Sequence, residues 1–479
     1  MNVKWRGAKI ADDTIAAIIT PPGQGGIAAL RLAGRASLRL LRFHFRSIND
    51  IKLKSSAFRP FLMRYGLFVD EEGQPIDEVM AVYMPRNRSY TGADQVELFC
   101  HGGQQIVRLI LDCLIASGAR AAEPGEFTRM AFLSGRIDLS RAEAVAEIIA
   151  ASTQTSYYAA REHLIGAYST EIDSMRTNVI HLMAEVEASV DFPDEEIESA
   201  QRESLLASIQ NLIERTSALV ATYHGGRIIR EGFRIVIGGR PNAGKSSLFN
   251  KLLKQERALV MPTPGTTRDY LSEWIDLAGY KVNLIDTAGL RQSGGPIERA
   301  GQRSAQKLLT NADLILWVVD STARSWRSML AGDLKSLGHE RILLAFNKID
   351  LIDSGPEKPN VSRETTTRKE LALVDSSVKL SCVTGKGLKA LASELEVRIR
   401  RETPDLTDGA VVTSARHKQK LSAALKHLKS ARRKIRISES PELTAFDLRQ
   451  TAISFDELTG RIYNEEILGQ IFSKFCIGK

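Results

Sequence analysis

The sequence contains no long hydrophobic segment and few cysteines. No apolar run reaches the roughly 18 residues that a membrane-spanning helix needs, so we expect no transmembrane segment. The opening stretch "MNVKWRGAKIADDT" has basic residues but no apolar core, which is not the pattern of a secretory signal. The four cysteines are scattered and none forms a CxxC pair, so neither a zinc site nor a disulfide framework is indicated. These absences favour a protein of the reducing, cytoplasmic compartment.

What the sequence does contain is the composition of a large globular protein. Its 479 residues are 43% hydrophobic and 25% charged. A chain of this length exceeds one hydrophobic core, and we expect roughly two to four domains. The net charge of +8 fits a polyanionic partner, of which nucleic acid is the commonest, and it fits a merely basic soluble protein equally well.

The residue pattern changes along the chain. Residues 12–130 mix short apolar runs with glycine and proline, which is typical of strands joined by turns with some helix. Apolar residues recur at helical spacing from 140 to 222, as they do in Leu205, Ile209, Leu212 and Ile213, and again from 413 onwards, as in Leu421, Leu425 and Leu428. Between them, from 233 to about 400, β-rich runs alternate with helical ones, which predicts a parallel sheet with crossover helices.

The two helical segments lie on either side of this α/β unit. A proline-marked stretch, "DFPDEE" at 191–196, interrupts the first of them. Each segment alone has few helices with which to cover its apolar face, whereas together they make one bundle. We therefore predict a discontinuous helical domain with the α/β unit inserted into it, although two separate small bundles would leave the same pattern.

The stretch "GRPNAGKSS" carries a phosphate-binding pattern. Gly239, Gly244, Lys245 and Ser246 fit G-x4-G-K-S, with an apolar run before the pattern and a helical one after it. The glycines let backbone amides approach the phosphates at a helix N-terminus. Lys245 would place its ammonium on the β- and γ-phosphates, and Ser246 would ligate Mg²⁺.

Two further motifs at strand ends predict that the nucleotide is GTP. "VNLIDTAG" puts Asp286 after an apolar strand, where its carboxylate would hold the Mg²⁺ shell, and the Gly289 amide would meet the γ-phosphate. "ILLAFNKID" places Asn347, Lys348 and Asp350 after another such strand. The Asp350 carboxylate can accept from guanine N1–H and the 2-amino group, whereas adenine would leave it unpaired.

Weaker signals complete this site. Thr267 in "TPGTTRD" is a candidate second Mg²⁺ ligand on a switch loop, and Ser381 and Cys382 in "SCVTGKGL" would approach the base through backbone amides. Leu290 stands where Ras-like GTPases have a water-orienting glutamine, so that role must come from elsewhere. Asn242 is placed to help hold a monovalent cation near the phosphates; a role in turn geometry alone remains open.

Several other stretches match one family. They include "DTIAAIITPPGQGGIAALRLAG", "SYTGADQVELFCHGG", "PGEFTRMAFLSGRIDLSRAEAVAEII", "DFPDEEIE" and the terminal "FCIGK". With these the chain resembles the tRNA modification GTPases of the MnmE (TrmE) type along nearly its whole length. The phosphate-loop motifs are shared with many GTPases, whereas the N-terminal phrases and the C-terminal pentapeptide are specific.

The resemblance implies a multidomain fold. It implies an α+β folate-binding and dimerisation domain at 1–134, a discontinuous all-α helical domain at 135–230 and 401–479, and an inserted α/β P-loop GTPase domain, the G domain, at 231–400.

The resemblance also implies a function. The family hydrolyses GTP with potassium stimulation when two G domains dimerise face to face. With a flavoprotein of the MnmG (GidA) type, it adds an aminomethyl or carboxymethylaminomethyl group at C5 of the wobble uridine of certain tRNAs. The carbon comes from methylene- or formyl-tetrahydrofolate. The implied cofactors are GTP, Mg²⁺, K⁺ and the reduced folate, and the implied partners are a second copy of the chain, the flavoprotein and tRNA, with no membrane.

The family's functional positions can be carried onto this sequence. Glu298 resembles the glutamate that orients the attacking water, and with Lys245 and Cys476 it makes the implied catalytic set. Cys476 would contribute a thiol near the one-carbon chemistry or serve as a small buried apolar residue. The implied metal ligands are Ser246 and Thr267 for Mg²⁺, Asn242 for K⁺, and Met261, Thr263 and Thr266 in the loop between. The nucleotide positions are Asn242, Ala243, Gly244, Lys245, Ser246, Ser247, Met261, Pro262, Thr263, Pro264, Gly265, Thr266, Thr267, Asp286, Thr287, Ala288, Gly289, Asn347, Lys348, Asp350, Ser381, Cys382 and Val383.

Arg31, Glu97, Arg136 and Lys479 match the family's folate-binding positions. Their cations can pair with a glutamyl carboxylate tail, and the carboxylate can accept from pterin N–H groups. The apolar phrase "IFSKFCI" would dock the chain end so that Lys479 is ordered. Arg136 replaces the family's usual lysine, which keeps the charge but changes its geometry. Met261 likewise replaces a threonine, and "CV" at 382–383 replaces alanine and lysine.

Two interpretations remain beside this one. The run "KHLKSARRKIR" at 426–436 places Lys426, Lys429 and Arg433 on one helical face, which is either a tRNA backbone contact or a solvated face without a binding role. A regulatory GTPase of ribosome assembly would use the same phosphate-loop motifs, but nothing in that class explains the first 130 residues.

Overall fold

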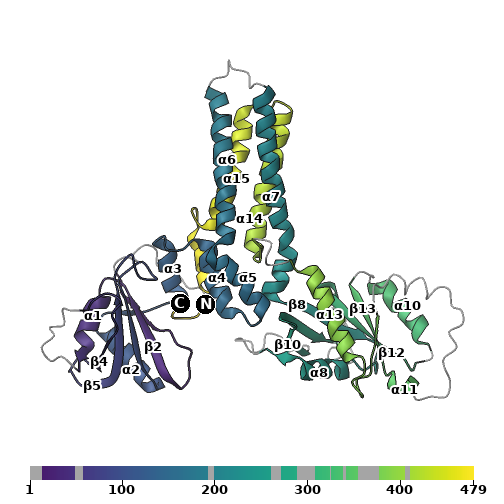
Figure 1. Cartoon of the computed structure of the whole chain (residues 1–479), viewed down its shortest axis with the longest axis horizontal. Helices are drawn as coiled ribbons and strands as arrows, with labels where there is room; N and C mark the ends of the chain where they lie inside the picture. Colours follow the sequence, from purple (N-terminus) through teal and green to yellow (C-terminus); the bar gives the residue numbers. More distant parts are fainter. Residues whose placement is uncertain are drawn as a thin grey trace, which may run out of the picture. The chain divides into compact units, whose positions relative to one another are not determined.

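The computed structural model describes residues 13–48, 58–191, 199–259, 271–287, 308–323, 325–337, 341–353, 377–404 and 410–479. The chain divides into two compact units (Figure 1). The first unit comprises residues 1–149, 163–212 and 423–479, and the second comprises 150–162 and 213–422.

The N-terminal part of the first unit is a seven-stranded sheet with the order β3-β4-β5-β6-β2-β1-β7. Neighbouring strands in this sheet are antiparallel, except that β1 and β7 are parallel. The strands are β1 (Ile15–Ile18), β2 (Gly25–Ala33), β3 (Phe45–Ser47), β4 (Arg64–Val69), β5 (Pro75–Met84), β6 (Gln95–Gly102) and β7 (Arg120–Ala121). Helices α1 (Ser37–His44) and α2 (Gln104–Ala116) pack into the same core, where Val107, Ile110 and Leu114 of α2 recur at helical spacing. The predicted strands and turns are therefore present.

The last residues of the chain pack against this part of the first unit. Helix α16 (Glu465–Phe472) shares an apolar cluster with α3 (Glu126–Leu133) and α4 (Leu139–Ala150). Phe472 and Phe475 of the C-terminal segment lie in this cluster beside Phe132 and Leu139. The two phenylalanines of the apolar phrase near the chain end are therefore buried as the sequence predicts, whereas Ile477 of the same phrase is exposed.

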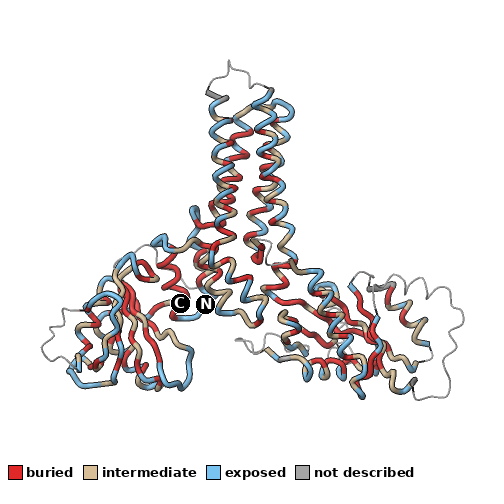
Figure 2. Tube along the Cα trace, viewed as in Figure 1, coloured by how far each residue is buried: buried red, intermediate tan, exposed pale blue. Residues whose placement is uncertain are grey.

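Four long helices form a bundle, and the burial in Figure 2 follows its inward faces. They are α6 (Ala167–Asp191), α7 (Ser199–Glu231), α14 (Ala415–Arg436) and α15 (Pro441–Thr459). Helices α6 and α15 belong to the first unit, whereas α7 and α14 each begin in one unit and end in the other. Helices α6 and α15 pack along each other although most of the chain's second unit lies between them in sequence. Helix α6 is described as far as Asp191 and α7 from Ser199. The predicted break at 191–196 lies, apart from Asp191, outside the described residues.

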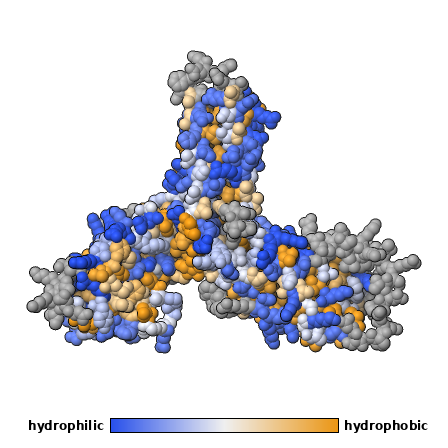
Figure 3. Space-filling view, in the orientation of Figure 1, coloured by the Kyte–Doolittle hydropathy of each residue, from blue (hydrophilic) through white to orange (hydrophobic). Residues whose placement is uncertain are grey.

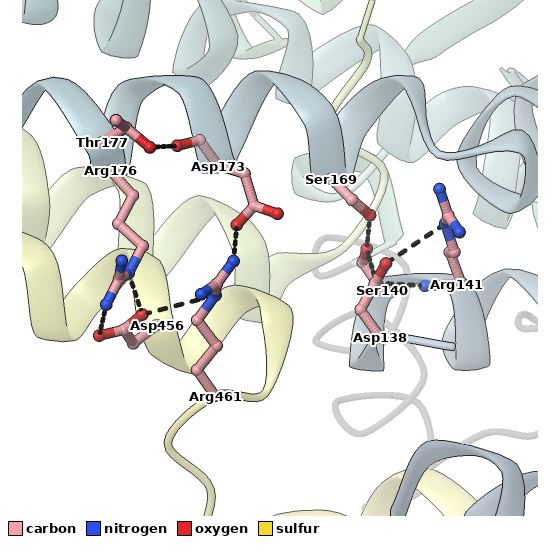
Figure 4. A network of polar contacts seen from close by, with 9 residues as sticks. All are labelled: Asp138, Ser140, Arg141, Ser169, Asp173, Arg176, Thr177, Asp456 and Arg461. Carbon is pink, nitrogen blue, oxygen red and sulfur yellow. Dashed lines mark hydrogen bonds and ion pairs between the residues drawn. The ribbon is translucent and has the colours of Figure 1, made fainter. Parts of the chain in front are cut away.

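Polar contacts fix the packing of α6 against its neighbours (Figure 4). Arg176 of α6 makes a charged hydrogen bond to Asp456 of α15, and Arg461 reaches Asp173 of α6 at 3.0 Å. The Asp138 carboxylate accepts from the Arg141 amide at 2.9 Å, which caps the start of α4.

The second unit contains the predicted parallel sheet, with the order β14-β13-β12-β8-β11-β10-β9. Strands β14, β13, β12, β8 and β11 are parallel to one another, and β10 is antiparallel to both of its neighbours, β11 and β9. The strands are β8 (Phe233–Gly239), β9 (Arg257–Ala258), β10 (Leu271–Leu277), β11 (Tyr280–Asp286), β12 (Leu314–Asp320), β13 (Ile342–Asn347) and β14 (Ser377–Lys379). The helices around it are α8 (Lys245–Gln255), α10 (Trp326–Leu337), α11 (Asp350–Asp353) and α13 (Leu388–Glu402), and α5 (Gln154–Ile165) begins in this unit.

Both faces of this sheet are covered. Ile235 and Ile237 of β8 lie in one apolar cluster with α8 and α13, while Val236 lies in another with α10. This alternation is what a strand buried on both faces requires. The strand order reverses at β8, because β11 lies on one side of it and β12 on the other, and ligands of such sheets bind at the point of reversal. Among the described residues, no helix is long and apolar enough to cross a lipid bilayer.

Candidate functional site

The loop between β8 and α8 can be built only with glycine at two positions. Gly239 and Gly244 have positive φ angles of 142° and 97°. A Cβ at Gly239 would lie 2.4 Å from the Val318 carbonyl oxygen, and a Cβ at Gly244 would lie 2.2 Å from Nδ2 of Asn347. The loop is thus pressed against the ends of β12 and β13, which brings the first predicted motif into contact with the third.

The two groups predicted to hold Mg²⁺ from this loop and from β11 are adjacent. The Ser246 hydroxyl donates to Oδ2 of Asp286 at 2.7 Å, and Asp286 is fully buried at the end of β11. A hydroxyl and a carboxylate oxygen are hard ligands of the kind that Mg²⁺ prefers, so these residues fit that ion. Lys245 is buried, and its ammonium donates to the Arg240 carbonyl at 3.0 Å, across the mouth of the loop.

The predicted base-recognition residues join three loops. Asn347 donates to the Ala243 carbonyl at 2.9 Å, and its side-chain oxygen accepts from the Cys382 amide at 3.1 Å. The Ser381 hydroxyl accepts from the Val383 amide at 3.2 Å, which shapes the loop after β14. The loops after β8, β13 and β14 therefore share one hydrogen-bonded centre, as three motifs of one site require.

Lys348 is held in an uncommon backbone conformation. Its φ is 68°, and its ammonium pairs with Oδ2 of Asp320 at 2.6 Å. Burial raises the pKa of Asp320, but hydrogen bonds from Lys348 and Thr322 outweigh it, and the pKa lies below its ordinary value. Asp320 therefore stays ionised and fixes the lysine beside Asp350, the first residue of α11.

Asn242 has a φ of 60°, a left-handed conformation that asparagine tolerates better than most residues. The turn role that the sequence left open is therefore present, and the cation-binding role stays a prediction. Ser247 lies in the first turn of α8, and Thr287 donates to the Ile237 carbonyl at 2.9 Å. Burial raises the pKa of the Cys382 thiol, so this residue is a neutral part of the base loop.

Several predicted site residues lie outside the described residues. They are Met261, Pro262, Thr263, Pro264, Gly265, Thr266, Thr267, Ala288, Gly289 and Glu298, and Leu290 is another.

A cavity of about 340 Å³ lies beside the phosphate loop, and the sequence did not predict it. Its wall includes Trp317, Trp326 and Leu330, and its rim carries a double hydrogen bond between Arg240 and Asp333 at 3.0 and 3.1 Å. This pair ties the phosphate loop to α10. A usable signal existed for Asp320, which also lines the cavity, because it ends an apolar strand as Asp286 does.

In the N-terminal sheet, Arg31 and Glu97 form an ion pair. They face each other in register on β2 and β6, with 3.0 Å between Nε of Arg31 and Oε1 of Glu97. The side chains are 12% and 18% exposed, so the pair is largely removed from water. Gln95 also donates to Glu97, and the Arg31 guanidinium lies 5.5 Å from the ring centroids of both Tyr90 and Phe127.

The C-terminal tail reaches the same place. The Lys479 carbonyl accepts from the Phe127 amide at 3.2 Å, and Phe127 is one of the rings beside Arg31. Gly478 has a φ of 95°, and a Cβ there would lie 2.5 Å from the Ile18 carbonyl oxygen. The main chain of Lys479 thus lies beside Phe127, whose ring is next to Arg31 and so close to the Arg31–Glu97 pair. An arginine, a carboxylate and aromatic faces are groups that fit a folate.

The two remaining predicted residues are at the surface. Arg136 is exposed and donates to the Asn87 carbonyl at 3.0 Å. Cys476 is exposed, so its interpretation as a small buried residue is wrong, because its neighbour Phe475 fills the apolar cluster in its place.

Known proteins match this chain over nearly its whole length. The family model "MnmE helical domain" matches residues 139–476, and "GTP-binding protein TrmE N-terminus" matches 14–136. The tRNA modification GTPase MnmE of Roseiflexus sp. (strain RS-1) is 41% identical over 472 residues, which is 98% of this chain and 99% of the relative. That of Symbiobacterium thermophilum is 41% identical over 476 residues, which is 98% of this chain and 100% of the relative.

Among solved structures, the G domain of the T. maritima FeoB iron transporter is 27% identical and covers 36% of this chain and 98% of its own. Its TM-score of 0.25 is too low to bear on the fold. The two family models and the full-length relatives confirm the resemblance drawn from the motifs. The chain belongs to the MnmE family of tRNA modification GTPases.

Proposed function

We propose that this chain is the GTP-hydrolysing component of a tRNA-modifying complex that acts at C5 of the wobble uridine. With a flavoprotein of the MnmG type it adds an aminomethyl or carboxymethylaminomethyl group, using carbon from a reduced folate. One observation carries the proposal: one chain holds a phosphate loop bonded to a guanine-recognition motif and a tail docked beside the Arg31–Glu97 pair. A regulatory GTPase without modification chemistry would have no use for the tail docked beside the Arg31–Glu97 pair.

In the proposed G domain, residues 231–400, each group that meets the nucleotide has one task. Lys245 and the loop amides hold the β- and γ-phosphates in line for attack. Ser246, Asp286 and Thr267 would hold Mg²⁺, which when bound neutralises charge that develops on the phosphates. Asp350 would accept from the guanine edge, while Asn347 holds the phosphate loop through its hydrogen bond to the Ala243 carbonyl.

Water activation is assigned to Glu298 and potassium binding to Asn242. Glu298 would replace the absent glutamine at Leu290, and Asn242, with Met261, Thr263 and Thr266, would complete a K⁺ site when two G domains meet. Replacing Glu298 with alanine should lower hydrolysis by about 10²–10⁴-fold and leave GTP binding intact. A parallel fall in binding would make Glu298 a structural residue instead.

We assign folate binding to Arg31, Glu97, Arg136 and Lys479, and a role at the one-carbon group to Cys476. The Arg31–Glu97 pair supports this assignment because a cation and a carboxylate that are already desolvated lose little more water on binding. The folate-binding domain at 1–134 and the helical domain at 135–230 and 401–479 then enclose one ligand between the first strands and the last residues of the chain.

The same domain is proposed to dimerise. Residues on and before β4 and β5 expose apolar side chains, with Phe61, Leu62, Met63, Tyr65 and Met80 all more than a third exposed. Tyr65 and Met80 are paired across the two strands, so they form one surface. Figure 3 shows hydrophobic surface over the N-terminal sheet. Exposed apolar patches of this kind are typical of protein interfaces, and a second copy is the expected occupant in the cytoplasm.

Nucleoside mass spectrometry of tRNA from a strain that lacks this chain tests the proposal. Loss of the C5-modified wobble uridine is expected, with return of the modification when the intact chain is supplied. An unchanged nucleoside profile would favour the ribosome-assembly switch. Calorimetry of the full chain with a reduced folate separates the same two functions, because the switch predicts no folate binding.

A further inference from the structure

Helix α14 (Ala415–Arg436) has an unusual charge composition. Its sequence, "ARHKQKLSAALKHLKSARRKIR", contains many lysines and arginines and no aspartate or glutamate. Surface helices of soluble proteins normally mix both signs, because like charges three or four residues apart destabilise a helix. The helix therefore needs its acidic partners from elsewhere in the fold or from another molecule.

Some of these cations do find partners inside the protein. Lys434 pairs with the buried Asp447 of α15 at 2.8 Å and donates to the Leu443 carbonyl at 3.0 Å. Arg432 donates to Gln210 of α7. These residues hold α14 in the bundle and are not free to bind a ligand.

Four others face outward. Lys426, Lys429, Arg433 and Arg436 are exposed, and within the described ranges their side chains make no ion pair and no hydrogen bond. We call these residues the basic stripe. On the adjacent helix the exposed arginine is neutralised instead, because Arg449 pairs with Glu187 at 2.9 Å. The lack of neutralisation is therefore particular to α14 and not to the bundle, whose surface is mostly hydrophilic in Figure 3.

The spacing of the basic stripe suits a linear polyanion. Steps of three, four and three residues place these side chains within an arc of about 80° along about 15 Å of helix. One strand of a nucleic-acid duplex carries a phosphate about every 3.4 Å of its axis, so the stripe spans about four phosphates. Lysine and arginine bind phosphate oxygens through charged hydrogen bonds, without reading the base sequence.

We propose that the basic stripe of α14 binds the sugar–phosphate backbone of the tRNA substrate. This inference rests on the proposed function, which makes tRNA a partner, and it adds where on the chain the RNA lies. Because the contact is to phosphates, it supplies affinity and orientation, while the choice among tRNAs is made elsewhere.

The test is binding of a fluorescent, unmodified tRNA transcript to the full chain, measured by anisotropy over a series of KCl concentrations. A triple variant, Lys426→Glu, Lys429→Glu and Arg433→Glu, should raise the dissociation constant by about tenfold or more at low salt. The slope of log affinity against log salt should become shallower by about two to three. GTP hydrolysis without tRNA should be unchanged, because no residue of the stripe belongs to the nucleotide site.

A matched control changes the same number of charges elsewhere. Arg39, Arg108 and Lys389 are exposed residues of α1, α2 and α13, and their replacement by glutamate alters the net charge equally. If both triple variants weaken binding to the same extent, the effect is one of net charge and the proposal is overturned. If the glutamate variant of the stripe folds poorly, glutamine can replace the same three residues, because it removes the charge without repelling phosphate. The slope of log affinity against log salt must then still become shallower.

Further outcomes separate this inference from the proposed function. The stripe variant could bind tRNA as the unaltered chain does and yet no longer bind anionic vesicles or an acidic protein. The stripe would then serve that other ligand, and the inference would be wrong. If the unaltered chain shows no tRNA binding, it is equally wrong. Neither result touches the nucleoside profile of the deletion strain, on which the proposed function depends.

Discussion

The two sheets of this protein place their candidate sites in opposite ways. In the parallel sheet the functional side chains stand at strand ends, since β8, β11, β12 and β13 finish at Gly239, Asp286, Asp320 and Asn347. In the antiparallel sheet the Arg31–Glu97 pair lies within strands β2 and β6. Strand ends lead into loops that carry several site residues in a row, whereas a residue within a strand points alone to its face.

This difference predicts how modular each site is. A strand-end site assigns separate recognition tasks to separate loops, so one substitution should change one specificity. A site built across strands shares one ion pair between neighbours, so either substitution should damage the whole site. The following variants test that contrast.

The largest effect is expected from Asp350→Asn. The amide cannot accept both N–H groups of guanine, and GTP affinity should fall on the order of 10³-fold. Xanthosine triphosphate has a carbonyl in place of the 2-amino group, so the asparagine amide can donate to it and its affinity should rise. Competition of the two nucleotides for a fluorescent GDP analogue measures both changes, and retained GTP preference would show that Asp350 does not read the base.

A smaller loss is expected from Arg31→Ala and Glu97→Gln in folate binding. Each removes a charged hydrogen bond of a pair that is 12% and 18% exposed, which is worth about 1.5–3 kcal/mol, or about 10- to 100-fold in affinity. The double variant should lose little more than either single one, because both act on the same contact. Calorimetry with a reduced folate tests this, and fully additive losses would mean that the two residues bind the ligand independently.

The sequence predicted the parallel sheet, and it predicted which of the described loops would meet, because loops after parallel strands keep their residues together. Gly244, Lys245 and Ser246 are contiguous, and the structure joins Ser246 to Asp286 as expected. The Arg31–Glu97 pair could be found only through the family resemblance, because 66 positions separate the two residues and the phrases that contain them do not reveal a binding chemistry by themselves.

The contacts that no motif predicted are those set by tertiary packing. The Arg240–Asp333 ion pair joins positions 93 residues apart, and it forms only because α10 packs beside the phosphate loop. Lys434 and Asp447 are close in sequence, but their ion pair requires the turn that brings α15 back onto α14. Such pairs depend on how the chain folds back on itself. The periodicity of apolar residues in the sequence does not predict that path.

A moderate effect is expected at Asn242, where two roles can be separated. Its φ of 60° means that alanine would disturb the loop as well as remove an oxygen. Asn242→Gly keeps that conformation accessible and removes only the side chain. If the oxygen holds K⁺, this variant should lose most of the rate advantage of KCl over NaCl at equal ionic strength, about tenfold or more. If the residue only shapes the turn, the glycine variant should keep the potassium response.

The smallest effect concerns how the chain end is attached to the antiparallel sheet. Gly478→Ala places a methyl group 2.5 Å from the Ile18 carbonyl oxygen at a φ of 95°, so the tail should lift away from β1. Gly118→Ala is the matched control, because its φ of 106° carries similar backbone strain but nothing lies within 4 Å of the new methyl group.

Carboxypeptidase should therefore remove Lys479 faster from the Gly478 variant than from the Gly118 variant, and folate affinity should fall about two- to tenfold. The affinity falls because ordering the released tail again costs conformational entropy at each binding event. Equal digestion of the two variants would mean that backbone strain alone explains the change. The tail would then contribute nothing to the site across β2 and β6, which would reduce that site to the ion pair within the sheet.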